Sequence, residues 1–180
     1  FGFNNDFDIA LTNKKYFQYY NTSGWYRLDF YRFTIFWHID LGGPSLNTTH
    51  GHCDTGSFCL YIDGCPVLAD IGRYNYTDLA AGKYGISAAA HNSIMIDGLE
   101  PFAPANYPDF YISSHCDISY KDEGEKFTFK ISHDGFNRIF NDKINLQREF
   151  TVQKDNIQII DNLEGRKRHN LEQSFHFYPG

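Results

Sequence analysis

The segment Ser57–Asp70, SFCLYIDGCPVLAD, decides the fold of this 180-residue chain. Two short apolar runs flank Asp63-Gly64, a dipeptide that favours a two-residue hairpin turn. An unbroken register from this turn gives the hairpin one wholly apolar face, which must point into a core. The pairs on that face are Ile62 with Cys65, Leu60 with Val67 and Phe58 with Ala69. The other face carries Asp70 at the open end of the hairpin.

Strand-like runs recur along most of the chain. Aromatic residues make up 18 % of it, with 13 Tyr and 17 Phe, which favours β-structure. The runs lie at residues 25–40 (two strands), 91–97, 110–122, 126–134, 144–155, 156–165 and 171–180, and long loops lie at 41–56 and 71–90. This spacing predicts an all-β fold, an antiparallel β-sandwich of two sheets, with long loops at one end carrying the site.

Charge and hydropathy exclude two classes of partner. The formal net charge of −6 argues against nucleic-acid binding, which needs Lys and Arg opposite phosphate. The sequence contains no apolar run of 18 or more residues, so we expect no membrane span. The first residues, FGFNNDFDIA, contain no Met and do not form a signal peptide. We expect a piece of a longer protein, with residues 1–23 as a leading segment and 24–180 as the β-sandwich domain.

The four cysteines show neither a CxxC pair nor the spacing of a disulfide framework. They are Cys53, Cys59, Cys65 and Cys116. The hairpin register puts Cys59 and Cys65 on opposite faces, where they cannot form a disulfide. We expect mostly buried thiols.

The hairpin brings two polar side chains together. His52 comes just before its first strand and Asp70 ends its second, so both emerge at the open end. His91 opens a later strand and is a third candidate, although spacing alone does not force it to lie beside the hairpin. Two histidines and a carboxylate suit zinc, with water as a fourth ligand. Ordinary polar loop residues are the alternative reading.

Two stretches carry a resemblance to a known family. HGHCDTGSFCLYIDGCPVLADIGRYNY (50–76) and AAAHNSIMIDG (88–98) resemble the signature of heparinase II/III-like polysaccharide lyases, a group that includes related alginate and oligo-uronate lyases. The later segments SHDGF, LQREFTVQKDNIQIIDNLEG and FHFYPG are also similar to that domain. The resemblance covers the chain from about Gly24 to its end.

The resemblance implies a bacterial, two-part enzyme that is periplasmic or secreted. An N-terminal α/α toroid packs against the β-sandwich, and the active site lies in the cleft between them. The substrate is an acidic, uronic-acid-containing polysaccharide such as a glycosaminoglycan or alginate, and the reaction is β-elimination. In the family the toroid supplies the group that neutralises the substrate carboxylate, together with a key tyrosine. This chain is expected to be the sandwich portion, inactive when alone.

The resemblance also implies roles for individual residues. His50 matches the catalytic histidine, whereas His52, Asp70 and His91 match the ligands of a mainly structural zinc. Tyr84 is either the loop tyrosine that some relatives use as an acid or an aromatic residue packed on the sandwich.

Two further features of the signature bear on the site. Asp54 is expected to orient an imidazole by accepting its hydrogen bond. The stretch GKYGISAAAHN lacks the arginines that many members have before Ala-His-Asn, which leaves the identity of the polymer open.

Two other functions compete with the lyase. One is a non-catalytic, metal-stabilised module linked to capsule or O-antigen polysaccharide metabolism. The other is a cupin-like enzyme that uses His52, Asp70 and His91 as an iron triad. Cupins need a glutamate shortly after His-x-His, and none lies near. A purely structural zinc does not require His50, so the presence of that residue favours the lyase over the non-catalytic module.

Overall fold

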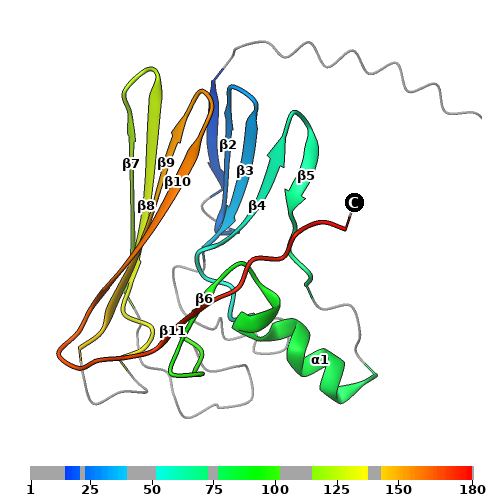
Figure 1. The fold of residues 1–180 in the computed structure, drawn as a ribbon, viewed down its shortest axis with the longest axis vertical. Helices are drawn as coiled ribbons and strands as arrows, with labels where there is room; N and C mark the ends of the chain where they lie inside the picture. Colours follow the sequence, from blue (N-terminus) through cyan, green and yellow to red (C-terminus); the bar gives the residue numbers. More distant parts are fainter. Residues whose placement is uncertain are drawn as a thin grey trace, which may run out of the picture.

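The computed structural model describes residues 15–20, 23–39, 52–72, 77–101, 115–137 and 143–179. These residues form two antiparallel sheets that face each other, with a short helix and a two-stranded ribbon at one end (Figure 1). The predicted all-β antiparallel sandwich is therefore confirmed.

The first sheet contains five strands in the order β1-β2-β3-β4-β5. Its strands are β1 (Tyr16–Tyr20), β2 (Trp25–Phe30), β3 (Phe33–His38), β4 (Ser57–Ile62) and β5 (Cys65–Leu68). β1 falls within residues 1–23, and it pairs with β2 from Tyr16↔Asp29 to Tyr20↔Trp25. The sheet therefore includes part of the segment predicted to lead into the domain.

The second sheet contains four strands in the order β10-β9-β8-β7. Its strands are β7 (Cys116–Asp122), β8 (Lys126–His133), β9 (Asn145–Gln153) and β10 (Ile157–Glu164). β8 and β9 alternate strictly between buried and half-buried residues over most of their length, as strands with one face on a core must.

Aromatic side chains from both sheets form the core. Trp37 of β3 stacks on Phe129 of β8 at a centroid distance of 4.4 Å, and Phe150 of β9 meets Trp37 edge-on at 5.3 Å. All three are fully buried. Aromatic pairs contribute about 0.5–1.5 kcal/mol beyond the area they bury. The aromatic composition noted in the sequence thus serves packing between the sheets.

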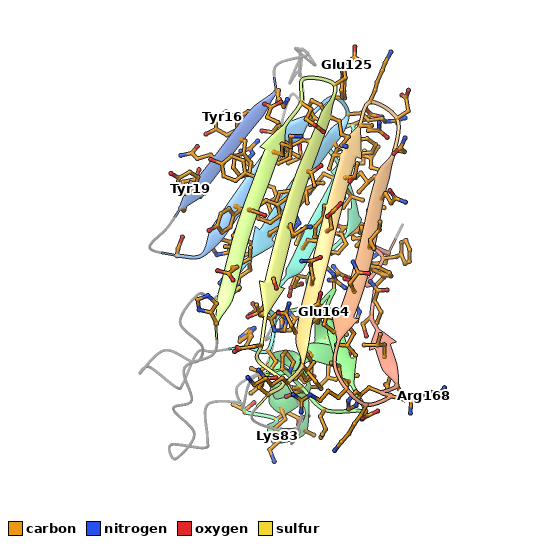
Figure 2. All side chains as sticks on the ribbon, turned by 90° about the vertical axis from the view of Figure 1, so that its left-hand side faces the viewer. Tyr16, Tyr19, Lys83, Glu125, Glu164 and Arg168 are labelled. Atoms are coloured by element: carbon orange, nitrogen blue, oxygen red, sulfur yellow. The ribbon has the colours of Figure 1, made fainter. Side chains whose placement is uncertain are left out.

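A small subdomain closes one end of the sandwich. It contains α1 (Leu79–Ile86), η1 (Ala88–Ala90), β6 (Ile94–Ile96) and β11 (Leu171–Gln173). The helix begins where the Asp78 carboxylate accepts hydrogen bonds from the amides of Ala80 and Ala81. Figure 1 shows α1, β6 and β11 below the two sheets, and Figure 2 shows Lys83 at this end and Glu125 at the opposite one. Within the described residues, no helix has the length and apolarity needed to cross a membrane.

The β4–β5 hairpin forms around Asp63-Gly64 as predicted, and both residues have positive φ, 51° and 78°. Ile62 pairs with Cys65 as expected. Beyond Tyr61 the register shifts by a bulge, and Leu60 pairs with Leu68. The predicted pairing of Leu60 with Val67 is therefore wrong. A bulge inserts one extra residue into a strand, and the two-residue turn alone gives no indication of it.

The expectation of mostly buried cysteines was also wrong. Of the four, only Cys53 is buried, and Cys65 is exposed beside the hairpin turn. Cys59 and Cys116 are partly exposed. Cys65 follows Gly64 directly, so it lies at the tip of the sheet, where the second sheet does not cover it.

Candidate metal centre at the closed end of the sandwich

Three side chains from two loops converge beside α1. His52, Asp54 and His91 each offer a ligand atom, and these atoms all lie within 4.8 Å of one another. The rings of His52 and His91 have centroids 5.2 Å apart. His91 is 1 % exposed, whereas His52 and Asp54 are half-buried. Two imidazoles and one carboxylate form the donor set that zinc prefers.

Asp70 lies against His91. Its two oxygens are 2.9 and 2.8 Å from His91 Nδ1, and it also accepts hydrogen bonds from the Ser57 hydroxyl and the Gly72 amide. Burial alone would raise the pKa of Asp70, but the hydrogen bonds from His91, Gly72 and Ser57 together hold that pKa below its ordinary value. Asp70 is therefore a carboxylate that can either bind an ion directly or orient His91.

The other nitrogen of His91 is the observation that favours a metal. His91 Nε2 is buried and has no hydrogen-bond partner among the described residues. An unpaired buried polar atom costs about 1–3 kcal/mol. A metal ion beside Nε2 would remove this cost, with Nδ1 held by a carboxylate as metal-binding histidines usually are. The residues present thus fit a zinc site.

The protonation state of His52 also suits a ligand. Burial lowers its pKa, as do the nearby His91 and His38, and the negative charge of Asp54 only partly offsets them. A lowered pKa keeps the imidazole neutral near pH 7. Neutral imidazole is the form that binds metal.

His38 is a site residue that sequence reasoning missed. It ends β3, its Nδ1 lies 2.8 Å from Asp54 Oδ2, and Trp25 packs against its ring at 4.9 Å. The prediction that Asp54 orients an imidazole is thus met at His38. The only available indication was a histidine at the end of a strand that pairs directly with β4 through His38↔Ser57.

Asn92 is the second residue whose role the sequence did not reveal. Its side-chain amide donates to the carbonyls of Phe58 (2.7 Å) and Ala69 (3.0 Å), and its oxygen accepts from the amide of His176 (2.7 Å). Its exposed fraction is 0 %. Asn92 therefore joins β4, the end of the hairpin beside Asp70 and the C-terminal segment.

The loop that carries His52 is attached to α1. The amide of Cys53 donates to the carbonyl of Ile86 at 2.9 Å, and the Cys53 thiol donates to Glu100 at 3.3 Å. The other carboxylate oxygen of Glu100 accepts from the amide of Ala88 at 3.0 Å. These bonds place His52 and Asp54 next to the segment that leads into His91.

Of the two predicted catalytic residues, Tyr84 and His50, the structure describes only Tyr84. Tyr84 lies on α1, is 45 % exposed, and its hydroxyl donates a long hydrogen bond of 3.4 Å to the carbonyl of Ala89, two residues before His91. A partly exposed tyrosine whose hydroxyl reaches the segment before His91 suits either of its two predicted roles. His50 lies outside the described residues.

The fold and the site define a β-sandwich domain built around a histidine–carboxylate cluster. A family model described as heparinase II/III-like, C-terminal, matches residues 12–180, and the chain belongs to that family. Among curated proteins, none matches the sequence.

Solved heparinase III structures have the same fold. Two structures of one heparinase III gene product, the second with methylated lysines, are 14 % and 16 % identical, with TM-scores of 0.68 and 0.69 and 91 % of this chain covered in each. A further crystal structure of heparinase III is 16 % identical, with a TM-score of 0.70 and 93 % of this chain covered. The chain spans about a quarter of each of these proteins, namely 24 %, 24 % and 25 %.

Proposed function

We propose that this chain is the β-sandwich portion of a polysaccharide lyase that cleaves a uronic-acid-containing polysaccharide by β-elimination. Its membership of the heparinase II/III-like family is the observation that carries the proposal. The chain spans about a quarter of the heparinase III structures. The proposal therefore includes a second part, an α/α toroid, that completes the active site. The proposal implies a periplasmic or secreted protein that meets acidic polymers there.

β-Elimination needs three groups around one sugar. The substrate carboxylate must be neutralised, a base must remove the C5 proton, and an acid must protonate the leaving glycosidic oxygen. We assign His50 to this proton chemistry. His50 is two positions before the cluster residue His52 in the sequence. Tyr84 is the proposed acid, because its side chain is partly exposed on α1, the helix whose Ile86 carbonyl accepts from Cys53 next to His52.

Zinc is proposed as a structural ion at the cluster. His52 and His91 would bind it, with Asp70 or Asp54 as the carboxylate ligand, and the ion would hold together the segments that carry the two histidines. Asp70 is the ligand that the family resemblance favours. Asp54 is favoured by its distance to both histidines. In either case the residues would act by holding the segment of His52 and Asp54 against that of His91.

The full-length protein tests the lyase proposal. Incubation with heparan-type and alginate-type polymers should generate unsaturated uronate, followed as new ultraviolet absorbance. His50→Ala should abolish product and leave the bound zinc unchanged. Residues 1–180 alone should be inactive, because positioning of groups on both walls supplies much of the rate enhancement.

Two results would contradict the proposal. Product formation by residues 1–180 alone would remove the two-part active site. A zinc-loaded full-length protein that cleaves no uronate polymer would instead support the non-catalytic, metal-stabilised module.

A further inference from the structure

Arg148 is a buried cation that belongs to the sheet opposite the metal cluster. It lies on β9, is 4 % exposed, and forms a two-pronged ion pair with Asp161 of β10, with Nε–Oδ1 at 2.7 Å and Nη2–Oδ2 at 3.1 Å. Asp161 also accepts a hydrogen bond from Gln173 of β11 at 2.9 Å. A buried charge is costly unless it is paired and its remaining donors are used. The N–H groups of Arg148 that do not contact Asp161 therefore also need hydrogen-bond acceptors.

The third guanidinium nitrogen of Arg148, Nη1, contacts the backbone beside the metal cluster. Nη1 donates to the carbonyl of Asn92 at 2.8 Å and to the carbonyl of Gly56 at 3.1 Å. Asn92 directly follows His91, and Gly56 lies two residues after Asp54. One nitrogen atom thus holds both backbone segments that carry the clustered side chains.

Through Arg148, the second sheet not only packs against the first sheet but also holds the backbone beside the metal cluster. Asn92 directs its side chain to β4, the hairpin end and the C-terminal segment, whereas its carbonyl is held by Arg148. The planar guanidinium has five N–H donors in fixed directions, so it can bind a carboxylate and two carbonyls at once. Stability alone does not require such a group, because apolar replacements of buried ion pairs are often neutral or stabilising.

We propose that Arg148 is a positioning residue for the metal cluster. Its guanidinium, neutralised by Asp161, fixes the separation of the Gly56 and Asn92 carbonyls, and through them the separation of His52 and Asp54 from His91. Zinc affinity therefore depends on a side chain of the second sheet that does not touch the ion. The inference rests on the proposed zinc site, but not on the proposed lyase activity.

The test compares two double variants of the full-length protein. Arg148→Met with Asp161→Leu replaces the buried pair by apolar groups and removes both carbonyl contacts. Lys130→Met with Glu149→Leu is the control, because this ion pair (2.9 Å) also joins two neighbouring strands of the same sheet, β8 and β9, but lies on its half-exposed side. Zinc affinity is measured by competition with a chromogenic chelator, at a temperature where each variant is folded by circular dichroism.

The expected result is a selective loss of affinity. Changing residues that orient metal ligands typically weakens metal binding about 10–100-fold. We expect a loss in this range for the Arg148/Asp161 variant and an affinity within about twofold of wild type for the control. The rise in melting temperature on adding zinc should shrink in the first variant only, which a loss of packing alone would not cause.

Arg148→Lys keeps the test decisive if the double variant fails to fold. Lysine retains the charge beside Asp161, but its single nitrogen cannot serve the carboxylate and both carbonyls. A folded Arg148 variant that binds zinc as tightly as wild type would overturn the inference. A wild-type protein that binds no zinc would overturn it together with the zinc site. Zinc binding without lyase activity would refute the lyase alone.

Discussion

Replacing Asn92 by alanine should destabilise the fold far more than its small size suggests. The side chain is completely buried, and its removal takes one hydrogen-bond partner from three backbone groups: the buried carbonyl of Phe58, and the carbonyl of Ala69 and amide of His176, which belong to half-buried residues. Each buried unsatisfied group costs about 1–3 kcal/mol. Because two of the three groups belong to half-buried residues, the sum is about 2–4 kcal/mol, still a large share of the ~5–15 kcal/mol that stabilises a typical domain.

The assay is thermal and chemical unfolding of the wild type and two variants. For a domain of this size each kcal/mol lowers the melting temperature by about 2–4 °C, so Asn92→Ala should lower it by roughly 5–15 °C. Asn162→Ala is the matched control, because Asn162 lies exposed on β10 and should change the free energy of unfolding by less than about 0.5 kcal/mol.

A third variant tests the hydrogen-bond reasoning itself. Asn92→Asp keeps the shape and the oxygen that accepts from His176, but it places a second oxygen against the carbonyls of Phe58 and Ala69. It should therefore be at least as unstable as Asn92→Ala. Melting temperatures of Asn92→Ala and Asn162→Ala within about 2 °C of each other would show that the three contacts contribute little.

Three other predictions concern titration, catalysis and metal binding. Burial, reinforced by the charge of Arg148, lowers the pKa of His133 to about 4 from an ordinary 6.5. The unfolded chain therefore binds the proton first, and stability is full above pH 6.5 and falls towards pH 4, by about 3 kcal/mol in total. His133→Asn should lose this pH dependence in urea titrations at several pH values, and an unchanged profile would contradict the assignment. Tyr84→Phe should change the free energy of unfolding by less than about 0.5 kcal/mol. The same substitution should lower lyase kcat about 100-fold or more. An unaltered kcat would mean that Tyr84 is a packing residue. Chelator treatment should lower the melting temperature, as followed by scanning calorimetry with and without zinc. This effect should vanish in whichever of Asp54→Asn and Asp70→Asn removes the direct ligand. An undiminished effect in both variants would exclude each carboxylate as an essential ligand.

The sequence predicted the strands well because their residues alternate. β2, β3, β8, β9 and β10 were all placed correctly from runs of aromatic and β-branched residues. β1 was missed because residues 1–23 were interpreted as a leading segment. The bulge at Leu60/Tyr61 was missed because the turn type fixes only the first pairs of a hairpin. Helix α1 was predicted only as a helical turn within a loop, since its short sequence LAAGKYGI contains two glycines.

The candidate site was only partly predictable, for a reason of chain distance. His52 and Asp70 could be grouped because one hairpin returns the chain to its starting point. His91 had to be added from the family resemblance, since a loop of unknown path precedes it. Arg148 contacts Gly56 across 92 positions of sequence and Asn92 across 56. No periodicity or turn rule connects residues so far apart, and only the packing of the two sheets brings them together.

The contacts of the two nitrogens of His91 bear on whether Asp70 would bind the ion directly. Nδ1 is held by the Asp70 carboxylate, so the ring orientation and the tautomer are fixed before an ion binds. With Nδ1 protonated, Nε2 is the free lone pair, and it is the buried atom that lacks a partner. If Asp70 moved wholly onto the ion, Nδ1 would lose this acceptor. The observed contacts thus favour Nε2 as the atom that would bind an ion, with His52 and Asp54 as the neighbouring donors and the Asp70 carboxylate beside Nδ1.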